Sequence, residues 1–158
     1  MGGMTTPPLR EAARVIALDD ARRVLLLRYR EGGGYWATPG GSLEAGENHA
    51  AAALRELREE LGVEEKDVVL GTQIAQRSTD HAVGGREVRQ VERYFLAQLA
   101  PKDVDPAGAT QPDNIQALRW WTLQELGDTP ETIYPVGLLD LITEVLAKGV
   151  PERPIVLR

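Results

Sequence analysis

One segment, residues 48–62, constrains the fold of this chain most, because it predicts a helix with both ends defined. Asn48 is a residue type that caps helix N-termini with its side chain, and Gly62 can adopt the left-handed conformation that ends a helix. The leucines between them lie within about 40° of Ala50 on a helical wheel: Leu54, Leu57 and Leu61. We therefore expect a helix over residues 49–61 with one apolar face.

Runs rich in β-branched residues and leucine lie on both sides of this helix. Residues 12–18 and 24–30, joined by the turn-forming residues 19–22, predict a hairpin. The other expected elements are a Gly-rich loop at 31–39, strands at 67–76, 87–98 and 117–122, loops at 77–86 and 100–112, and a helix at 136–148. This order predicts an α/β fold in which a mixed β-sheet lies between helices.

The chain has 158 residues, which suits one domain with a sizeable core. We expect a flexible N-terminal segment at 1–10, a single domain at 11–150 and a C-terminal tail at 151–158.

Charge and residue usage exclude several classes of protein. The 24 acidic residues against 18 Lys and Arg give a net charge of −6, and no basic block suggests binding to a nucleic-acid polymer. There are no cysteines, so disulfides, thiolate zinc sites and cysteine nucleophiles are absent. No segment resembles a signal peptide or a membrane span, which predicts a cytoplasmic protein without membrane contact.

The polar face of the helix carries three glutamates, Glu56, Glu59 and Glu60, at about 180° to 280° from Ala50. Spacings of three and four residues make these carboxylates neighbours that repel one another. Either arginines offset the repulsion, as Arg55 can for Glu59, or a cation does. On its own, a string of this kind is most often a solvated acidic face.

The residues around the glutamates change this interpretation. Five residues separate Gly41 from Glu47, seven more precede Arg55, and residues 55–63 read RELREELGV. This segment resembles the Nudix box, G-x5-E-x7-R-E-U-x-E-E-x-G-U with U aliphatic, and matches it at every defined position. A chance match is on the order of 10⁻⁷. The stretch 36–41, WATPGG, is similar to the usual lead-in of Nudix proteins, and the resemblance implies the α/β/α Nudix sandwich.

The resemblance also implies roles for the residues of the box. The three glutamates of the polar face would bind Mg²⁺ or Mn²⁺, with Gly40 supplying a backbone carbonyl ligand. Arg55 would orient the glutamates, and Glu47 would brace the loop or join an outer metal shell. Such ions prefer oxygen ligands, and one would neutralise a pyrophosphate that this acidic protein otherwise repels. We favour Glu59 as the base that activates water.

Other acids are alternatives for these roles. Glu44 lies in the same loop, Glu92 lies on the expected strand 87–98, and Asp113 precedes the last strand. Each is as readily explained as an exposed surface acid.

Nudix hydrolases cleave nucleoside diphosphates linked to another group, so the implied substrate is a small nucleoside diphosphate derivative. None of the subfamily markers for ADP-ribose, diadenosine polyphosphate or NADH hydrolases occurs here. Candidate substrate contacts are Tyr35 and Trp36 for stacking on a base, Arg28 and Arg77 for phosphates, and His81. Each has an ordinary structural alternative, such as a core position for Trp36.

Two alternatives complete the predictions. A Nudix domain that binds nucleotide derivatives without catalysis is the competing function, although the complete box favours a pyrophosphohydrolase. A homodimer is possible, since dimers are common among Nudix proteins.

Overall fold

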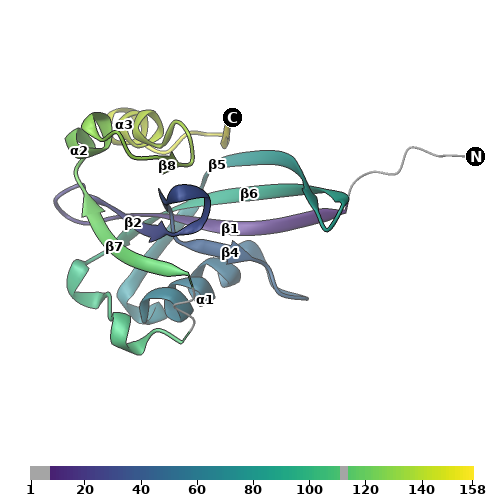
Figure 1. Ribbon diagram of the computed structural model, residues 1–158. Helices are drawn as coiled ribbons and strands as arrows, with labels where there is room; N and C mark the ends of the chain where they lie inside the picture. Colours follow the sequence, from purple (N-terminus) through teal and green to yellow (C-terminus); the bar gives the residue numbers. More distant parts are fainter. Residues whose placement is uncertain (1–7, 111–113) are drawn as a thin grey trace, which may run out of the picture.

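The structure, a computed structural model, describes residues 8–110 and 114–158. In this part of the chain, nine strands form one mixed sheet with α-helices packed on its faces (Figure 1). The strand order is β8-β3-β2-β1-β6-β5-β9, with β4 paired to β1 and β7 paired to β2. The strands are β1 (Leu9–Leu18), β2 (Val24–Tyr29), β3 (Tyr35–Ala37), β4 (Gly40–Ser42), β5 (Val68–Val83), β6 (Arg86–Leu99), β7 (Ile115–Trp121), β8 (Ile133–Tyr134) and β9 (Ile155–Leu157). The α-helices are α1 (His49–Leu61), α2 (Leu123–Asp128) and α3 (Leu138–Lys148), and 3₁₀ turns lie at Glu31–Gly33, Glu65–Asp67, Pro101–Asp103 and Pro106–Gly108.

The sheet buries both of its faces. Because side chains alternate along a strand, neighbouring residues of β1 and β2 belong to different cores. Val15 and Leu25 pack in the core on the α1 side, whereas Ile16 and Leu26 pack in the core beneath α2 and α3. Figure 1 shows α1 on one side of the sheet and α2 with α3 on the other. The predicted α/β sandwich with a mixed sheet between helices is therefore confirmed.

Helix α1 begins and ends where the sequence predicts. The Asn48 side chain accepts a hydrogen bond from the Ala51 N–H, and Gly62 adopts φ +64° and donates its N–H to the last turn. The buried residues of α1 include Leu57 and Leu61, which lie in the core against the sheet. The opposite face of the helix is thereby left to the charged residues.

The expected loop at 77–86 is wrong, because these residues continue the two neighbouring strands. Val83 pairs with Arg86 across a tight turn at Gly84 and Gly85, whose φ values are +58° and +80°. Residues 77–86 are mostly polar on both faces of this two-stranded extension, so their sequence lacks the apolar alternation that marks a half-buried strand. The extension brings this part of β5 and β6 beside the cavity described below.

Several short elements also differ from the prediction. Helix α2 begins at a capping box, in which Thr122 and Glu125 exchange hydrogen bonds; its T-x-x-E pattern is visible in the sequence. Residues 151–158, expected as a tail, contain β9, which pairs in parallel with β5. Strand β1 begins at Leu9, inside the segment expected to be flexible. Among the helices of the described residues, none has the length and apolar character needed to span a membrane.

Candidate functional site

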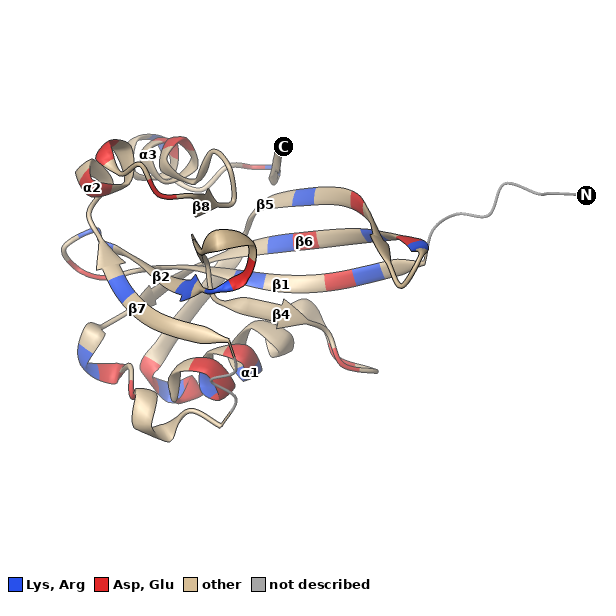
Figure 2. Ribbon diagram, in the orientation of Figure 1, with Lys and Arg blue, Asp and Glu red and all other residues tan. Residues whose placement is uncertain are grey.

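Arg55 is the centre of the charged face of α1. Its Nε and Nη2 donate to the two carboxylate oxygens of Glu47 at 2.8 and 2.9 Å. Its Nη1 donates to Glu56 and Glu59, both at 3.0 Å, and Nη2 also reaches the Ser42 carbonyl at 3.0 Å. Only 12% of the Arg55 side chain is exposed. Figure 2 shows the acidic and basic residues along this helix. The Arg55 guanidinium therefore aligns three glutamates and connects α1 to the preceding loop.

The loop before α1 is braced by the same network. The Glu44 N–H donates to Glu47 at 3.0 Å, and the Glu44 carboxylate lies 3.1 Å from Arg55 Nε. The hydrogen bond from Arg55 lowers the pKa of Glu47 to about 2. Glu47 is therefore ionised at neutral pH and serves as an anchor for the arginine.

Glu60 lies apart from this network, at the edge of the sheet. One of its oxygens accepts the backbone N–H of Gly40 at 2.9 Å, and the other accepts the Tyr29 hydroxyl at 3.3 Å. Burial raises the pKa of Glu60 to about 7, and the nearby Glu56 carboxylate adds to the rise. Burial likewise raises the pKa of Glu56, against the opposing effect of Arg55. Two partly buried carboxylates thus lie close together without full compensation of their charge.

Two adjacent glycines allow the strand β4 to pass between β1 and α1. Gly40 has φ +145°, and a Cβ there would lie 2.2 Å from the Ala13 carbonyl oxygen. At Gly41, a Cβ would lie 2.4 Å from a carboxylate oxygen of Glu56. A side chain at position 40 is excluded by the neighbouring backbone, and one at position 41 is excluded by the Glu56 carboxylate.

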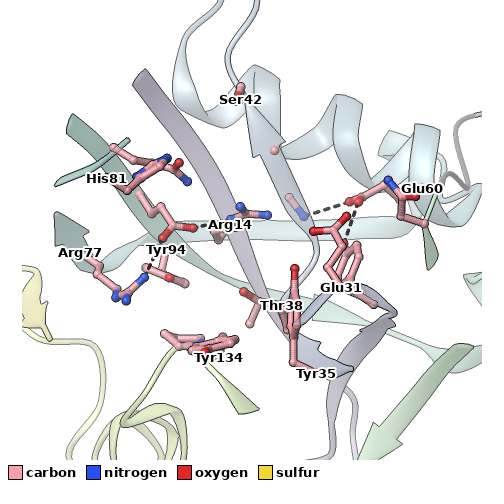
Figure 3. Close-up of a pocket in the computed structure, with 18 residues that line it drawn as sticks. Arg14, Glu31, Tyr35, Thr38, Ser42, Glu60, Arg77, His81, Tyr94 and Tyr134 are labelled. Carbon is pink, nitrogen blue, oxygen red and sulfur yellow. Dashed lines mark hydrogen bonds and ion pairs between the residues drawn. The ribbon is translucent and has the colours of Figure 1, made fainter. Parts of the chain in front are cut away.

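A cavity of about 770 Å³ opens beside Glu60. Figure 3 shows Glu60 on one side of it, Arg77 and His81 on the other, and Arg14 between them. Its lining residues come from the strands and the loops at their ends: Arg14, Tyr29, Glu31, Tyr35, Ala37, Thr38, Gly40, Gly41, Ser42, Glu60, Arg77, His81, Gln90, Glu92, Tyr94, Asn114, Tyr134 and Pro135.

One wall of this cavity is an ion-pair network across three strands. Glu92 on β6 accepts Arg14 Nε from β1 at 2.7 Å and Arg77 Nη1 from β5 at 3.3 Å. The Glu92 side chain is 9% exposed, whereas 23% of each arginine side chain is accessible. Arg77 Nε also donates to the main-chain oxygen of Arg158 at 2.7 Å, which fixes its guanidinium from a second side.

The opposite wall is aromatic. The rings of Tyr29 and Tyr35 stack with centroids 5.4 Å apart, and Tyr134 meets Tyr35 edge-on at 5.3 Å. Stacked and edge-on pairs of this kind hold the rings in fixed orientations. The cavity therefore joins a planar apolar wall to a cationic one.

The structure places two of the predicted substrate contacts, Trp36 and Arg28, away from the cavity. Trp36 is 6% exposed and packs edge-on against Trp121 in the core, because β3 directs it away from the cavity that its neighbour Tyr35 lines. Arg28 donates to Gln116 at 2.6 Å and does not line the cavity. Alternation along the strands separates both residues from the site.

The structure brings the other candidates together only in part. The cavity is lined by four of them, Tyr35, Glu60, Arg77 and His81. Glu56 and Glu59 do not line it and instead contact Arg55. Asp113 lies outside the described residues.

Sequence reasoning did not single out several residues that line the cavity: Arg14, Tyr29, Tyr94 and Tyr134. Only the alternation of β1 hinted at Arg14, a cation inside an apolar run.

The box residues fit a divalent cation, although within residues 8–110 and 114–158 no three His, Asp or Glu side chains converge as a finished ligand set. Arg55 holds Glu56 and Glu59, and Glu60 bonds to Gly40 instead. Glu60 is nevertheless a partly buried carboxylate with a raised pKa beside a second acid, which is an environment that a cation would neutralise. Its oxygen donors are those that Mg²⁺ and Mn²⁺ prefer.

Comparison with known families agrees with the fold and the site. The NUDIX domain family matches residues 8–139. The chain therefore belongs to the Nudix family.

Two curated relatives share about a third of their aligned residues with the chain. An RNA pyrophosphohydrolase of Gluconacetobacter diazotrophicus is 32% identical over 102 residues, covering 60% of each protein. A putative 8-oxo-dGTP diphosphatase 2 of Mycobacterium tuberculosis is 36% identical over 95 residues, covering 60% of this chain and 59% of that protein. The matched region thus spans about three fifths of these relatives.

Solved structures show the same fold. A MutT protein from Methanosarcina mazei superposes with a TM-score of 0.67 at 18% identity, covering 93% of this chain and 99% of the other. An Ap4A hydrolase of C. elegans has a TM-score of 0.63 at 21% identity, covering 87% and 96%.

Proposed function

We propose that this chain is a divalent-metal-dependent pyrophosphohydrolase, which cleaves the pyrophosphate linkage of a nucleoside diphosphate derivative by attack of water on phosphorus. Family membership and the names of the two relatives support hydrolysis of a pyrophosphate bond. The proposed divalent metal and nucleoside diphosphate substrate are supported by the residues of the site.

The observation that carries the proposal is the state of Glu60. Burial and the neighbouring Glu56 raise its pKa to about 7, so the pair gains by binding a cation in place of a proton. We assign Glu56, Glu59 and Glu60 as ligands of Mg²⁺ or Mn²⁺, with the Gly40 carbonyl as a further oxygen donor. When bound, such an ion acidifies water and stabilises charge that develops on phosphoryl oxygens.

Arg55 orients the ligands. By donating to Glu56 and Glu59 together, it keeps both carboxylates on one side of α1, and its three hydrogen bonds to Glu47 and Ser42 fix its position. A guanidinium group can orient two carboxylates in this way because its N–H groups have a fixed planar geometry.

Glu59 is our candidate for the base that accepts a proton from the attacking water. It is 17% exposed, which leaves its carboxylate open to solvent, and a single hydrogen bond from Arg55 aligns it. Proton transfer by a positioned side chain contributes about 10²- to 10⁴-fold to a rate.

The rest of the cavity provides for the nucleoside part of the substrate. Tyr35, held between Tyr29 and Tyr134, presents a fixed ring on which a base can stack. Arg77 and His81 lie across the cavity from Glu60, where a phosphate group can be bound.

The test is release of phosphate or nucleoside monophosphate from a substrate panel, with and without Mg²⁺. The panel contains nucleoside triphosphates, ADP-ribose, dinucleoside polyphosphates, NADH, coenzyme A and nucleotide sugars. We expect Glu59→Gln and Glu60→Gln to lower turnover at least about a hundredfold while the fold is kept. Glu64→Gln is the matched control, because Glu64 is exposed beside Lys66 and outside the network.

Two results would contradict the proposal. Near wild-type activity in Glu59→Gln or Glu60→Gln would remove that residue from its role. Thermal stabilisation by a member of the panel without product from any member would favour a domain that binds nucleotide derivatives without catalysis. A homodimer and a cytoplasmic location stay predictions, which size-exclusion chromatography and cell fractionation test.

A further inference from the structure

A row of alternating charges crosses three neighbouring strands beneath the cavity, with Arg14 on β1, Glu92 on β6 and Arg77 on β5. Arg14 on β1 lies opposite Gly40 on β4, the residue that binds Glu60. On the other side of β1, Glu92 on β6 is in register with Ala12, and Arg77 on β5 is in register with Glu92. The order across the three strands is therefore base, acid, base, and Glu60 of α1 lies next to Arg14 at the β4 end of the row.

The row places Arg77 away from the carboxylates of the box, and Arg14 lies between Arg77 and Glu60 (Figure 3). Neighbouring strands lie about 4.8 Å apart, so Arg14 begins one strand from Gly40, and Arg77 begins two strands further. Both guanidinium groups approach Glu92, which places them side by side at the wall of the cavity. An anion bound there would be a different group from the one that meets Glu60.

Glu92 fixes the arginines without neutralising them. It uses one carboxylate oxygen for each arginine, and its side chain is more than nine tenths buried. In the hydrogen bonds of the described residues, Arg14 contributes only Nε, and Arg77 only Nε and Nη1. The remaining N–H groups belong to side chains that are 23% exposed on the cavity.

The balance of charge argues against a purely structural network. Arg14 and Arg77 share the carboxylate of Glu92, so these three side chains together carry a net charge of +1 beside the cavity, whose other acidic lining residues are Glu31 and Glu60. Oriented guanidinium groups with free N–H donors bind phosphate oxygens well. The same cavity has an aromatic wall, and Figure 3 shows its residues Tyr35 and Tyr134 below Arg14.

We infer that Arg14 and Arg77, held in place by Glu92, form an anion-binding subsite for a phosphate beyond the two that flank the scissile linkage. This inference rests on the proposed function and names its substrate class. Substrates are nucleoside derivatives with three or more phosphates in one chain, in preference to those that carry a sugar after the second phosphate. Glu92 is a positioning residue in this scheme.

A binding experiment without catalysis tests the subsite itself. Tripolyphosphate is titrated calorimetrically into the protein in a chelator and at low ionic strength, so that the arginines are measured without metal. We expect Arg77→Gln and Arg14→Gln each to weaken binding about tenfold, as for loss of a charge-assisted hydrogen bond. Arg89→Gln is the control, because Arg89 pairs with the exposed Asp80 and does not line the cavity. Equal affinities in all four proteins, or no binding by the wild type, would overturn the subsite.

Folding of each variant is checked by circular dichroism. If Arg14→Gln fails to fold, Arg14→Lys replaces it, because lysine keeps the charge but lacks the guanidinium group. The affinity of Arg77→Gln for tripolyphosphate then decides the result.

A kinetic experiment tests the substrate class. KM is compared for a nucleoside triphosphate and a nucleotide sugar of the same base, such as GTP and GDP-mannose. We expect Arg77→Gln to raise KM about tenfold for the triphosphate and to leave it unchanged for the sugar nucleotide. An equal rise for both would mean that Arg77 serves the scissile pyrophosphate, and would overturn the inference.

The two proposals fail differently. Arginine-dependent binding of tripolyphosphate in a protein that hydrolyses nothing would refute the hydrolase and keep the subsite. Metal-dependent hydrolysis, together with tripolyphosphate binding that does not depend on the arginines, would refute the subsite and keep the hydrolase.

Discussion

The backbone N–H of Gly40 donates to the Glu60 carboxylate at 2.9 Å, and this contact joins strand β4 to helix α1 at the edge of the cavity. Glu60 is held in a buried position in which ionisation is disfavoured, and burial with the nearby Glu56 raises its pKa to about 7. The residues are twenty positions apart in the chain, so the fold creates this environment.

We expect the metal-free protein to lose stability between about pH 4.5 and 7. The folded protein keeps the Glu60 proton in this window while the unfolded chain releases it, so the folded form binds more protons and stability falls as pH rises. A pKa raised from 4.5 to about 7 corresponds to about 3 kcal/mol at most. Urea unfolding at a series of pH values measures this slope.

The matched variant is Glu60→Gln, which keeps a hydrogen-bond acceptor for Gly40 and cannot titrate. It should flatten the profile over this pH range. An unchanged slope in the variant would show that another group is responsible.

The two glycines before the box predict opposite results for the same substitution. Gly40→Ala places a Cβ against the Ala13 backbone and requires φ +145° of a residue with a side chain, so we expect it to cost several kcal/mol of stability. Gly41→Ala meets only the tip of Glu56, which can rotate away. We expect a stability change of about 1 kcal/mol or less for Gly41→Ala, with turnover lowered at least about tenfold because Glu56, a proposed metal ligand, is displaced.

Thermal unfolding and turnover, measured on both variants, check this pair. A stable and fully active Gly41→Ala protein would show that the orientation of Glu56 has no role in the reaction.

Arg55→Lys tests whether the geometry of the guanidinium is needed. Lysine keeps the charge but cannot donate to Glu47, Glu56 and Glu59 at once, and Arg55 is only 12% exposed. We expect a loss of about 1 to 3 kcal/mol and a larger loss of affinity for Mn²⁺, measured by calorimetry. Arg58→Lys, on the same helix and outside the network, is the control. Unchanged Mn²⁺ affinity in Arg55→Lys would mean that Arg55 does not orient the ligands.

The sequence predicts the parts of this structure that depend on local pattern. Helix α1 has its cap, its apolar stripe and its terminal glycine within fifteen residues, so both of its ends could be predicted. The core strands likewise carry continuous apolar runs.

The cavity could not be predicted in the same way. Arg14, Glu92 and Arg77 meet because β1, β6 and β5 pair in one particular register, and no local pattern encodes that register. The continuation of β5 and β6 beyond residue 77 is stabilised by backbone pairing, which polar side chains do not reveal.

The different positions of Tyr35 and Trp36 give a last prediction. Adjacent strand residues face opposite sides, and the structure puts Tyr35 on the cavity and Trp36 in the core against Trp121. Tyr35→Ala should raise KM for the nucleoside substrate about tenfold, since base stacking is worth about 1 to 3 kcal/mol. Trp36→Phe should leave KM unchanged and lower stability by about 1 to 3 kcal/mol, because it shrinks a buried ring. A raised KM in Trp36→Phe, with Tyr35→Ala unaffected, would reverse the assignment and return Trp36 to the role of a base platform.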